Sequence, residues 1–154
     1  MATHRLAASL RIPLPIDRVF PFFSRAENLA RITPPELGFQ ILTPLPIVMR
    51  EGALIDYSIR LHGLPMRWRS LISKWNPPFE FVDEQIKGPY ASWHHTHRFR
   101  ADGDGVTIVD DEVLYRLPFS PLGDIALPIV KRQLARIFAY RTDVVQRLLL
   151  NGAA

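Results

Sequence analysis

The sequence predicts a single α+β domain in which a curved antiparallel sheet packs around one long C-terminal helix. Its 154 residues, 47% of them hydrophobic, suit one domain with one core. From about residue 38 to residue 117, alternating polar and apolar segments are separated by hairpin-length turns, as in antiparallel strands. After about residue 122 the apolar residues recur at three- and four-residue steps, which is typical of an amphipathic helix. Such a helix must bury its apolar face, and we expect it to do so against the sheet.

The chain opens with a strand and two short helices. Residues 4–14 alternate between apolar and polar side chains, which predicts a half-buried strand. Asp17 is a candidate N-cap for a first helix, in which Pro21 should interrupt or bend the backbone unless it lies in the first turn. A second short helix is expected near Ala26 to Ile32, because Pro34 and the proline after it stop helical structure there.

Six further strands are expected before the long helix. Glycine, proline, asparagine and aspartate mark the turns between them, with Gly63 and Pro65 forming one tight turn and the sequence Asp102-Gly103-Asp104-Gly105 giving the strongest hairpin signal. The expected strands cover residues 38–44, 53–62, 66–75, 79–86, 90–100 and 106–117.

The C-terminal helix is expected over about Leu122 to Leu150. Pro128 should lie in its first turns or mark its true start. The apolar residues that recur along it are Ile125, Ile129, Leu134, Ile137, Phe138, Val144, Val145 and Leu148. A curved sheet with a helix across it encloses space, and a pocket results wherever side chains do not fill that space.

Composition and charge argue against several classes of protein. Cysteine is absent, which excludes disulfides, thiolate metal ligands and a cysteine nucleophile, and fits a reducing cytoplasm. No apolar run approaches the ~18 residues of a spanning helix, and the N-terminal segment lacks the apolar core of a signal peptide. The net charge of +4 comes mainly from arginines, which form no run; the densest group is Arg132, Arg136 and Arg141. Nucleic-acid binding is therefore not expected, and brief contact with a membrane surface is left open.

The sequence WHHTHRF, residues 93–99, is the strongest functional signal. Alternate residues of a strand share a face, so His95 and His97 lie on one side with two large aromatic residues. His94 and Thr96 lie on the other side with two arginines, a polar set that we expect in water. The aromatic side belongs inside, so two histidines are expected to point into the interior.

The following strand brings a carboxylate close to these histidines. Asp111 shares a face with valines and Tyr115, and that face is the one better suited to burial. A buried carboxylate is costly unless it is paired or hydrogen-bonded. Hairpin pairing puts Asp111 within reach of His95 or His97, while the register that would choose between them is open.

Three interpretations of this group compete. In the first, His95, His97, Asp111 and Tyr115 form a buried and satisfied polar network. In the second, which overlaps with the first, they form the polar end of a ligand pocket. In the third, the two histidines and the carboxylate bind zinc or iron. No third histidine shares the face and bulky aromatic residues flank the pair, so we expect no metal and no other cofactor. No phosphate-binding loop or compact nucleophile motif is present.

Five segments together resemble a known superfamily. The resemblance is to a poorly characterised bacterial, ligand-binding subgroup of the SRPBCC superfamily, also described as START-like, Bet v 1-like or polyketide cyclase/dehydrase-like. It covers nearly all of a single domain over residues 1–154 and does not specify a ligand. Similar segments are found attached to sugar-nucleotide epimerase-like domains, and this chain carries no such domain. The segments are W-R-S-L-I-S-K-W from Trp68, F-V-D-E-Q-I-K-G-P-Y from Phe81, W-H-H-T-H-R-F from Trp93, D-E-V-L-Y-R-L-P from Asp111 and R-I-F-A-Y-R from Arg136.

The resemblance implies a helix-grip fold, in which a seven-stranded antiparallel sheet surrounds a C-terminal helix and a cavity lies between them. It also implies that inward residues of the long strands line this cavity. Arg141 on the helix is one of the matching positions, but an ion pair or a place on the helix surface would explain it as well as contact with a ligand. The matching positions are Tyr57, Trp68, Ile72, Trp93, His95, His97, Asp111, Tyr115, Ile137, Phe138 and Arg141.

Three hypotheses about function follow. The first, which we prefer, is a binding module that carries or senses a small hydrophobic molecule such as a lipid, an isoprenoid or a polyketide-like aromatic. The second is a cyclase, aromatase or dehydratase in which His95 or His97 acts as acid or base, oriented by Asp111, with Tyr115 as a donor. The third is an interaction protein that uses its basic surface.

Overall fold

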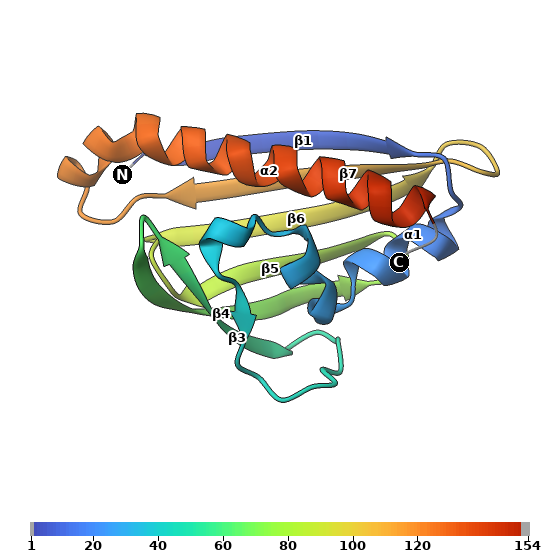
Figure 1. The fold of residues 1–154 in the computed structure, drawn as a ribbon, viewed down its shortest axis with the longest axis horizontal. Coiled ribbons are helices and arrows are strands. Elements are labelled where there is room, and N and C mark those ends of the chain that lie inside the picture. The colour runs from blue at the N-terminus through green and yellow to red at the C-terminus, as the bar shows by residue number, and fades with distance from the viewer. Residues whose placement is uncertain (1, 152–154) are drawn as a thin grey trace.

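The computed structural model describes residues 2–151, so Met1 and residues 152–154 of the expected domain 1–154 lie outside the described residues. A seven-stranded sheet curves around a long helix that crosses its concave face (Figure 1). The strand order is β1-β7-β6-β5-β4-β3-β2, and each pair of neighbouring strands is antiparallel. The α+β helix-grip architecture expected from the sequence is therefore confirmed.

The elements follow the expected order along the chain. The strands are β1 His4–Ile12, β2 Gln40–Ile41, β3 Leu54–Leu61, β4 Leu64–Asn76, β5 Glu80–Lys87, β6 Ser92–Ala101 and β7 Thr107–Arg116. The helical segments are α1 Ile16–Phe23, the 3-10 turns η1 Ala26–Ile32, η2 Pro35–Leu37 and η3 Leu122–Ala126, and α2 Leu127–Leu150.

Two short elements differ from expectation. The helix expected over Ala26 to Ile32 is a 3-10 helix, a form that is used in short pieces and suits a segment closed by prolines. The strand expected over residues 38–44 shortens to β2, although the next two backbone N–H groups still donate to the carbonyl of Asp56 on β3. In α1, Pro21 lies inside the helix, and the phenylalanines on either side of it are buried.

The turn between β3 and β4 is tighter than expected. His62 and Gly63 both have positive φ values, 51° and 81°, as in the primed turns that match the twist of antiparallel strands. Pro65 therefore belongs to β4, opposite Arg60, and not to the turn.

Helix α2 buries one face against the sheet along most of its length. Pro128 lies in its first turn, as expected. Leu134 and Val145 are fully buried, but Ile125 and Ile129 are 76% and 58% exposed, so their expected burial is wrong. Figure 1 shows the reason: the beginning of the helix, and η3 before it, extend past the end of β7, where no sheet lies beneath them.

Two apolar clusters pack helix α2 against the sheet, one toward each end of the helix. One joins α1 and the C-terminal half of α2 to the sheet through residues such as Phe99 and Val145. The other joins the N-terminal half of α2 to β7 through Val113 and Leu134. No helix among the described residues is long and apolar enough to cross a membrane.

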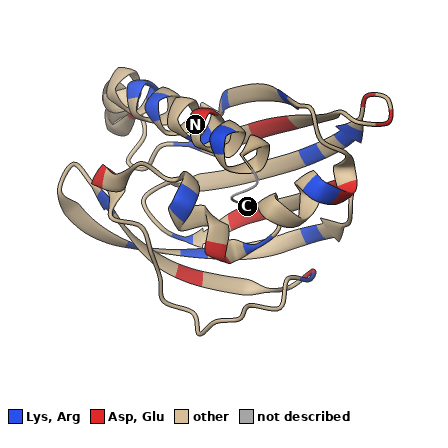
Figure 2. Cartoon of the chain, turned by 45° about the vertical axis from the view of Figure 1, so that its right-hand side comes forward, with Lys and Arg blue, Asp and Glu red and all other residues tan. Residues whose placement is uncertain are grey.

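Charged residues are spread over the elements, as Figure 2 shows, with blue and red segments interspersed. The densest arginine group of the sequence is partly neutralised, because Arg136 pairs with Glu36 at 2.9 Å and Arg141 pairs with Asp111 at 3.2 Å. Two of the three arginines in this group therefore have a carboxylate partner within the domain.

Candidate functional site

The candidate site is a polar cluster on the inner face of three adjacent strands. Strand β6 alternates, so His95 and His97 both point inward and are 6% and 4% exposed. Asp83 on β5 lies opposite His95, and Asp111 on β7 lies opposite His97. The register thus surrounds two histidines with two carboxylates, one from each neighbouring strand.

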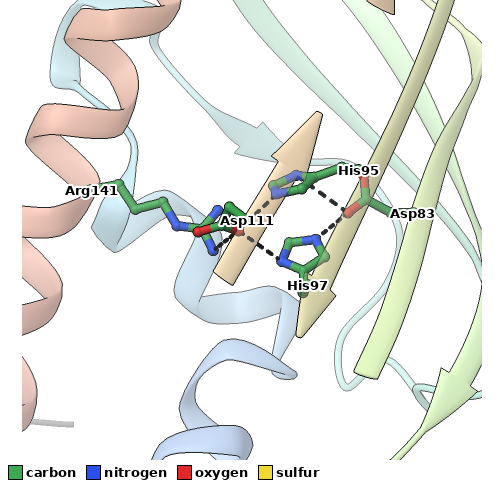
Figure 3. Close-up of polar contacts among 5 residues, drawn as sticks. All are labelled: Asp83, His95, His97, Asp111 and Arg141. Carbon is green, nitrogen blue, oxygen red and sulfur yellow. Dashed lines mark hydrogen bonds and ion pairs between the residues drawn. The ribbon is translucent and has the colours of Figure 1, made fainter. Parts of the chain in front are cut away.

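The four side chains contact one another directly (Figure 3). His95 Nε2 lies 2.8 Å from Asp111 Oδ1, and His97 Nε2 lies 2.6 Å from Asp83 Oδ2. The remaining ring nitrogens face the opposite carboxylates: His95 Nδ1 is 3.8 Å from Asp83 Oδ2, and His97 Nδ1 is 3.4 Å from Asp111 Oδ1. The two imidazole rings stack with centroids 3.7 Å apart. The expectation that Asp111 would reach one of the histidines is confirmed.

Helix α2 completes the cluster with a buried arginine. The guanidinium of Arg141 donates to Asp111 Oδ1 at 3.2 Å, and the two side chains are only 11% and 9% exposed. The same guanidinium lies over the rings of Phe23 and Phe138, at 5.3 and 5.6 Å from their centroids. Arg141 is therefore held between the two apolar clusters, and its ion pair links the helix to the sheet.

Burial and charge shift the pKa values of these groups. Burial, reinforced by the neighbouring His95, lowers the pKa of His97 to about 4, so this ring is neutral at pH 7. Burial acts to raise the pKa of Asp83, but the hydrogen bond with His97 and the surrounding positive charges outweigh it, and the pKa is lowered. Burial also acts to raise the pKa of Asp111, but the positive charge of Arg141 and the hydrogen bond with His95 outweigh it. The pKa of Asp111 therefore lies well below its usual range. Both carboxylates are therefore ionised at neutral pH.

The cluster forms one wall of a cavity of about 170 Å³ between the sheet, α2 and the short helices. Asp83, His95, His97 and Arg141 line it, and most of the remaining wall is aliphatic or aromatic. Of the positions expected to line it, the structure places nine on its wall: Tyr57, Trp68, Ile72, Trp93, His95, His97, Ile137, Phe138 and Arg141.

Two of the expected positions lie elsewhere. Asp111 is behind the histidines and reaches the cavity wall only through them and Arg141. Tyr115 is 2% exposed and packs against His4 and Trp93, so it is a core residue of β7 and not part of the histidine network.

Sequence reasoning missed Asp83, which makes the shortest contact in the cluster that involves a histidine. Asp83 is two residues after the inward-facing Phe81, and residues two apart on a strand share a face, so this spacing could have revealed it. The expectation that Thr96 would be in water is wrong, since its side chain is only 5% exposed. It lies between Val82 and Glu112 on the neighbouring strands, which flank it on the outer face.

The arrangement can do three things chemically. Its histidines can donate or accept hydrogen bonds to the polar group of a bound molecule. A neutral imidazole bonded to a carboxylate can also act as an acid or base. Asp83, His95 and His97 each offer a ligand atom, and these atoms lie within 4.8 Å of one another, which is a spacing that could hold a metal ion.

Comparison with known proteins gives a consistent picture of the fold. The chain matches no protein-family model, and a search of curated proteins finds no significant match. Among solved structures, the Zhui aromatase/cyclase from Streptomyces sp. R1128 is similar with a TM-score of 0.80 and 13% identity, covering 99% of this chain and 97% of that one. A START superfamily protein from Mycobacterium smegmatis is similar with a TM-score of 0.71 and 11% identity, covering 96% and 98%.

A third similar structure is a larger protein. It is the nucleoside-diphosphate sugar epimerase from Corynebacterium glutamicum, with a TM-score of 0.62 and 28% identity. The match covers 94% of this chain but only 29% of the epimerase, so the likeness is to one part of that protein. Taken with the sheet order and the position of α2, these similarities show that the chain has the SRPBCC, or START-like, helix-grip fold.

Proposed function

We propose that the protein binds a small, mostly apolar molecule in the cavity and holds its polar group against Asp83, His95 and His97. The observation that carries this proposal is the cavity itself, which is apolar on most of its wall and polar at one cluster. Such a site provides affinity by burying apolar surface and orientation by a few hydrogen bonds.

The size and lining of the cavity favour a compact, ring-containing ligand over a long lipid chain. An apolar cavity of roughly 150 Å³ accommodates a benzene-sized molecule, and this one measures about 170 Å³. Tyr57, Trp68, Tyr90 and Trp93 lie along it, and their faces and edges suit contact with another aromatic ring. Of the ligand classes considered, a polyketide-like aromatic therefore fits best.

Ligand binding can be followed through the two tryptophans that line the cavity, Trp68 and Trp93. A panel of phenols and other single-ring aromatic compounds should quench or shift their fluorescence with saturable, one-to-one binding. Ile137→Trp fills the cavity from the helix and should abolish this binding. Ile129→Trp is the matched control, because Ile129 is on the same helix but exposed, and it should bind as the wild type does. Equal affinity in both variants would contradict the proposal.

A second candidate function is catalysis on such a ligand, as a cyclase, aromatase or dehydratase. It is favoured by one observation: both histidines that line the cavity are bonded to carboxylates, which fix the orientation of each ring. The similar Streptomyces protein is named an aromatase/cyclase. Its sequence identity of 13% to this chain is evidence for a shared fold and not for a shared activity.

Substitution of the histidines separates the two functions. If the protein is an enzyme, His95→Ala and His97→Ala should keep measurable affinity for a bound compound and lose its turnover. If no compound that binds is converted by the wild type, the enzymatic function is excluded and binding stands alone.

A further inference from the structure

Each of the two histidines lies between the same two carboxylates, Asp83 and Asp111. All four ring nitrogens face a carboxylate oxygen of Asp83 or Asp111, at 2.6 to 3.8 Å. A metal-bound imidazole directs one nitrogen lone pair to the ion and the N–H of its other nitrogen to an acceptor, so it needs a suitable group on both sides of the ring. Both rings meet this condition here, and a lone pair that faces a carboxylate needs a cation between the two, either a proton or a metal ion.

The positions of the carboxylates show on which side this cation belongs. Asp111 faces His95 Nε2 at 2.8 Å and His97 Nδ1 at 3.4 Å, and it is already paired with Arg141. His97 Nδ1 is buried and makes no hydrogen bond. If both N–H groups point to Asp111, the two lone pairs, on His95 Nδ1 and His97 Nε2, converge on Asp83 Oδ2.

We propose that Asp83, His95 and His97 form a binding site for one divalent transition-metal ion, zinc or iron(II). A metal site was the third interpretation of the sequence and was set aside because no third histidine shares this face; here Asp83 supplies the third ligand from the neighbouring strand. With the ion bound, Asp111 would accept the remaining N–H of each ring, which is the usual support for metal-bound histidine; it already lies 2.8 Å from His95 Nε2 and 3.4 Å from His97 Nδ1. Arg141 compensates the charge of Asp111, so the charge of Asp83 is available to the ion.

The dimensions agree with such an ion. Zinc bonds of 2.0–2.2 Å place neighbouring ligand atoms roughly 3 Å apart, between the 2.6 and 3.8 Å separations from Asp83 Oδ2. Two imidazoles and one carboxylate are the donor set of catalytic zinc sites and of non-haem iron(II) sites. Because all three ligands line the cavity, the remaining coordination positions face it and would take water or an oxygen atom of a bound molecule. The site does not depend on the proposed organic ligand.

Titration of metal-free protein tests the site directly. Protein stripped with a chelator is titrated with Zn²⁺ by calorimetry and with Co²⁺ by visible absorption, without any organic ligand. We expect one equivalent to bind with micromolar or tighter affinity and Co²⁺ to give the ligand-field bands of nitrogen and oxygen coordination. If the wild type binds neither ion at millimolar concentration, the proposal is wrong, whatever the outcome of the experiments with aromatic compounds.

Variants then locate the ion. Asp83→Asn and His97→Gln should each weaken Zn²⁺ binding by more than the ~10–100-fold expected for Asp111→Asn, which removes only the acceptor behind the histidines. His94→Gln is the matched control, because it alters the adjacent histidine on the same strand but outside the cluster, and it should leave affinity unchanged. A loss in His94→Gln as large as in Asp83→Asn would overturn the assignment.

Imidazole ¹H–¹⁵N spectra of the wild type provide a readout that does not require any variant to fold. With Zn²⁺ bound, we expect the protons on His95 Nε2 and His97 Nδ1, with the other two nitrogens shifted by the metal. Spectra that do not change when Zn²⁺ is added would show that hydrogen bonds alone hold the cluster together, and would overturn the proposal.

Discussion

Asp111 is a buried carboxylate whose charge is compensated from the far end of the chain. Its partner Arg141 is 30 positions away in sequence and reaches it from α2. Removing one member of a buried ion pair leaves an uncompensated charge, which costs about 3–5 kcal/mol. Arg141→Met should therefore lower the free energy of unfolding by about this amount, as measured by urea denaturation at pH 7.

Two further variants distinguish the ion pair from loss of packing. Arg132→Met changes an exposed arginine on the same helix and should alter stability by less than about 0.5 kcal/mol. The double variant Asp111→Asn/Arg141→Met removes both charges and should be more stable than Arg141→Met alone. Equal stability of the single and double variants would show that the arginine acts only through its contacts with Phe23 and Phe138.

These residues also show what a single sequence can and cannot predict about the site. Strand alternation was enough to predict that His95, His97 and Asp111 point inward. Side chains of a strand alternate between two faces, so once one face is identified as buried, the orientation of every residue follows. This alternation could not pair Arg141 with Asp111, since that contact depends on how α2 crosses the sheet. Asp83 could have been placed by the same alternation, but it is one of three acidic residues in FEFVDEQI, and the segment does not show which strand lies beside it.

The turn from β7 into η3 depends on one glycine. A Cβ at Gly123 would lie 1.8 Å from the carbonyl oxygen of Pro118, which is far inside van der Waals contact. Gly123→Ala should therefore displace the turn and cost about 2 kcal/mol of stability in thermal or chemical unfolding. Gly105→Ala is the control in another turn, where nothing lies within 4 Å, and it should cost little. A neutral Gly123→Ala would mean that the turn shifts freely.

A charged link across three strands should make stability depend on pH. Glu80 on β5 contacts Lys74 on β4 and Arg98 on β6. The hydrogen bond from Lys74 is the main reason why the pKa of Glu80 is lowered from 4.5. Since the unfolded chain binds this proton more tightly, the stabilisation is complete above pH 4.5 and is lost as the pH falls below it.

Glu80→Gln removes that dependence. The variant should be less stable than the wild type by about 0.5–1 kcal/mol at pH 7, because both cationic partners are half exposed. The difference should shrink as the pH is lowered from 7 to 3, because the wild-type carboxyl takes up a proton in that direction. Denaturation curves at both pH values measure it, and a difference that persists at pH 3 would assign the effect to packing.

The elements themselves were largely predictable, and the exceptions have physical causes. Hairpins were recognised because glycine and proline mark their turns, and the long helix because its period differs from that of the strands. The length of β2 depends on its pairing with β3, which local patterns do not contain, and the 3-10 form of η1 is a variant of the helix that the same residues predicted. The exposure of Ile125 and Ile129 follows from where the sheet ends, and helical spacing alone cannot show that.

At the scale of the whole molecule, stability should be unevenly distributed along α2. Val145 is fully buried between α1 and the sheet, whereas Leu122 and Ile125, just before the helix, are 74% and 76% exposed. Val145→Ala should cost about 2 kcal/mol in chemical denaturation. Leu122→Gln and Ile125→Gln should each change stability by less than about 0.5 kcal/mol. A large loss in either glutamine variant would show that this end of the molecule has a partner in solution.

The pairing of β1 with β7 has a consequence for synthesis of the chain in the cell. His4 pairs with Tyr115 and Ile12 with Thr107, so the first strand made must wait for roughly 100 further residues before its neighbour exists. At ~5–20 residues per second, that delay is on the order of 5–20 s. During it, the backbone N–H and C=O groups of β1 and its alternating apolar side chains lack their native partner on the growing chain. A nascent chain halted before Thr107 is therefore the form of this protein most in need of a chaperone.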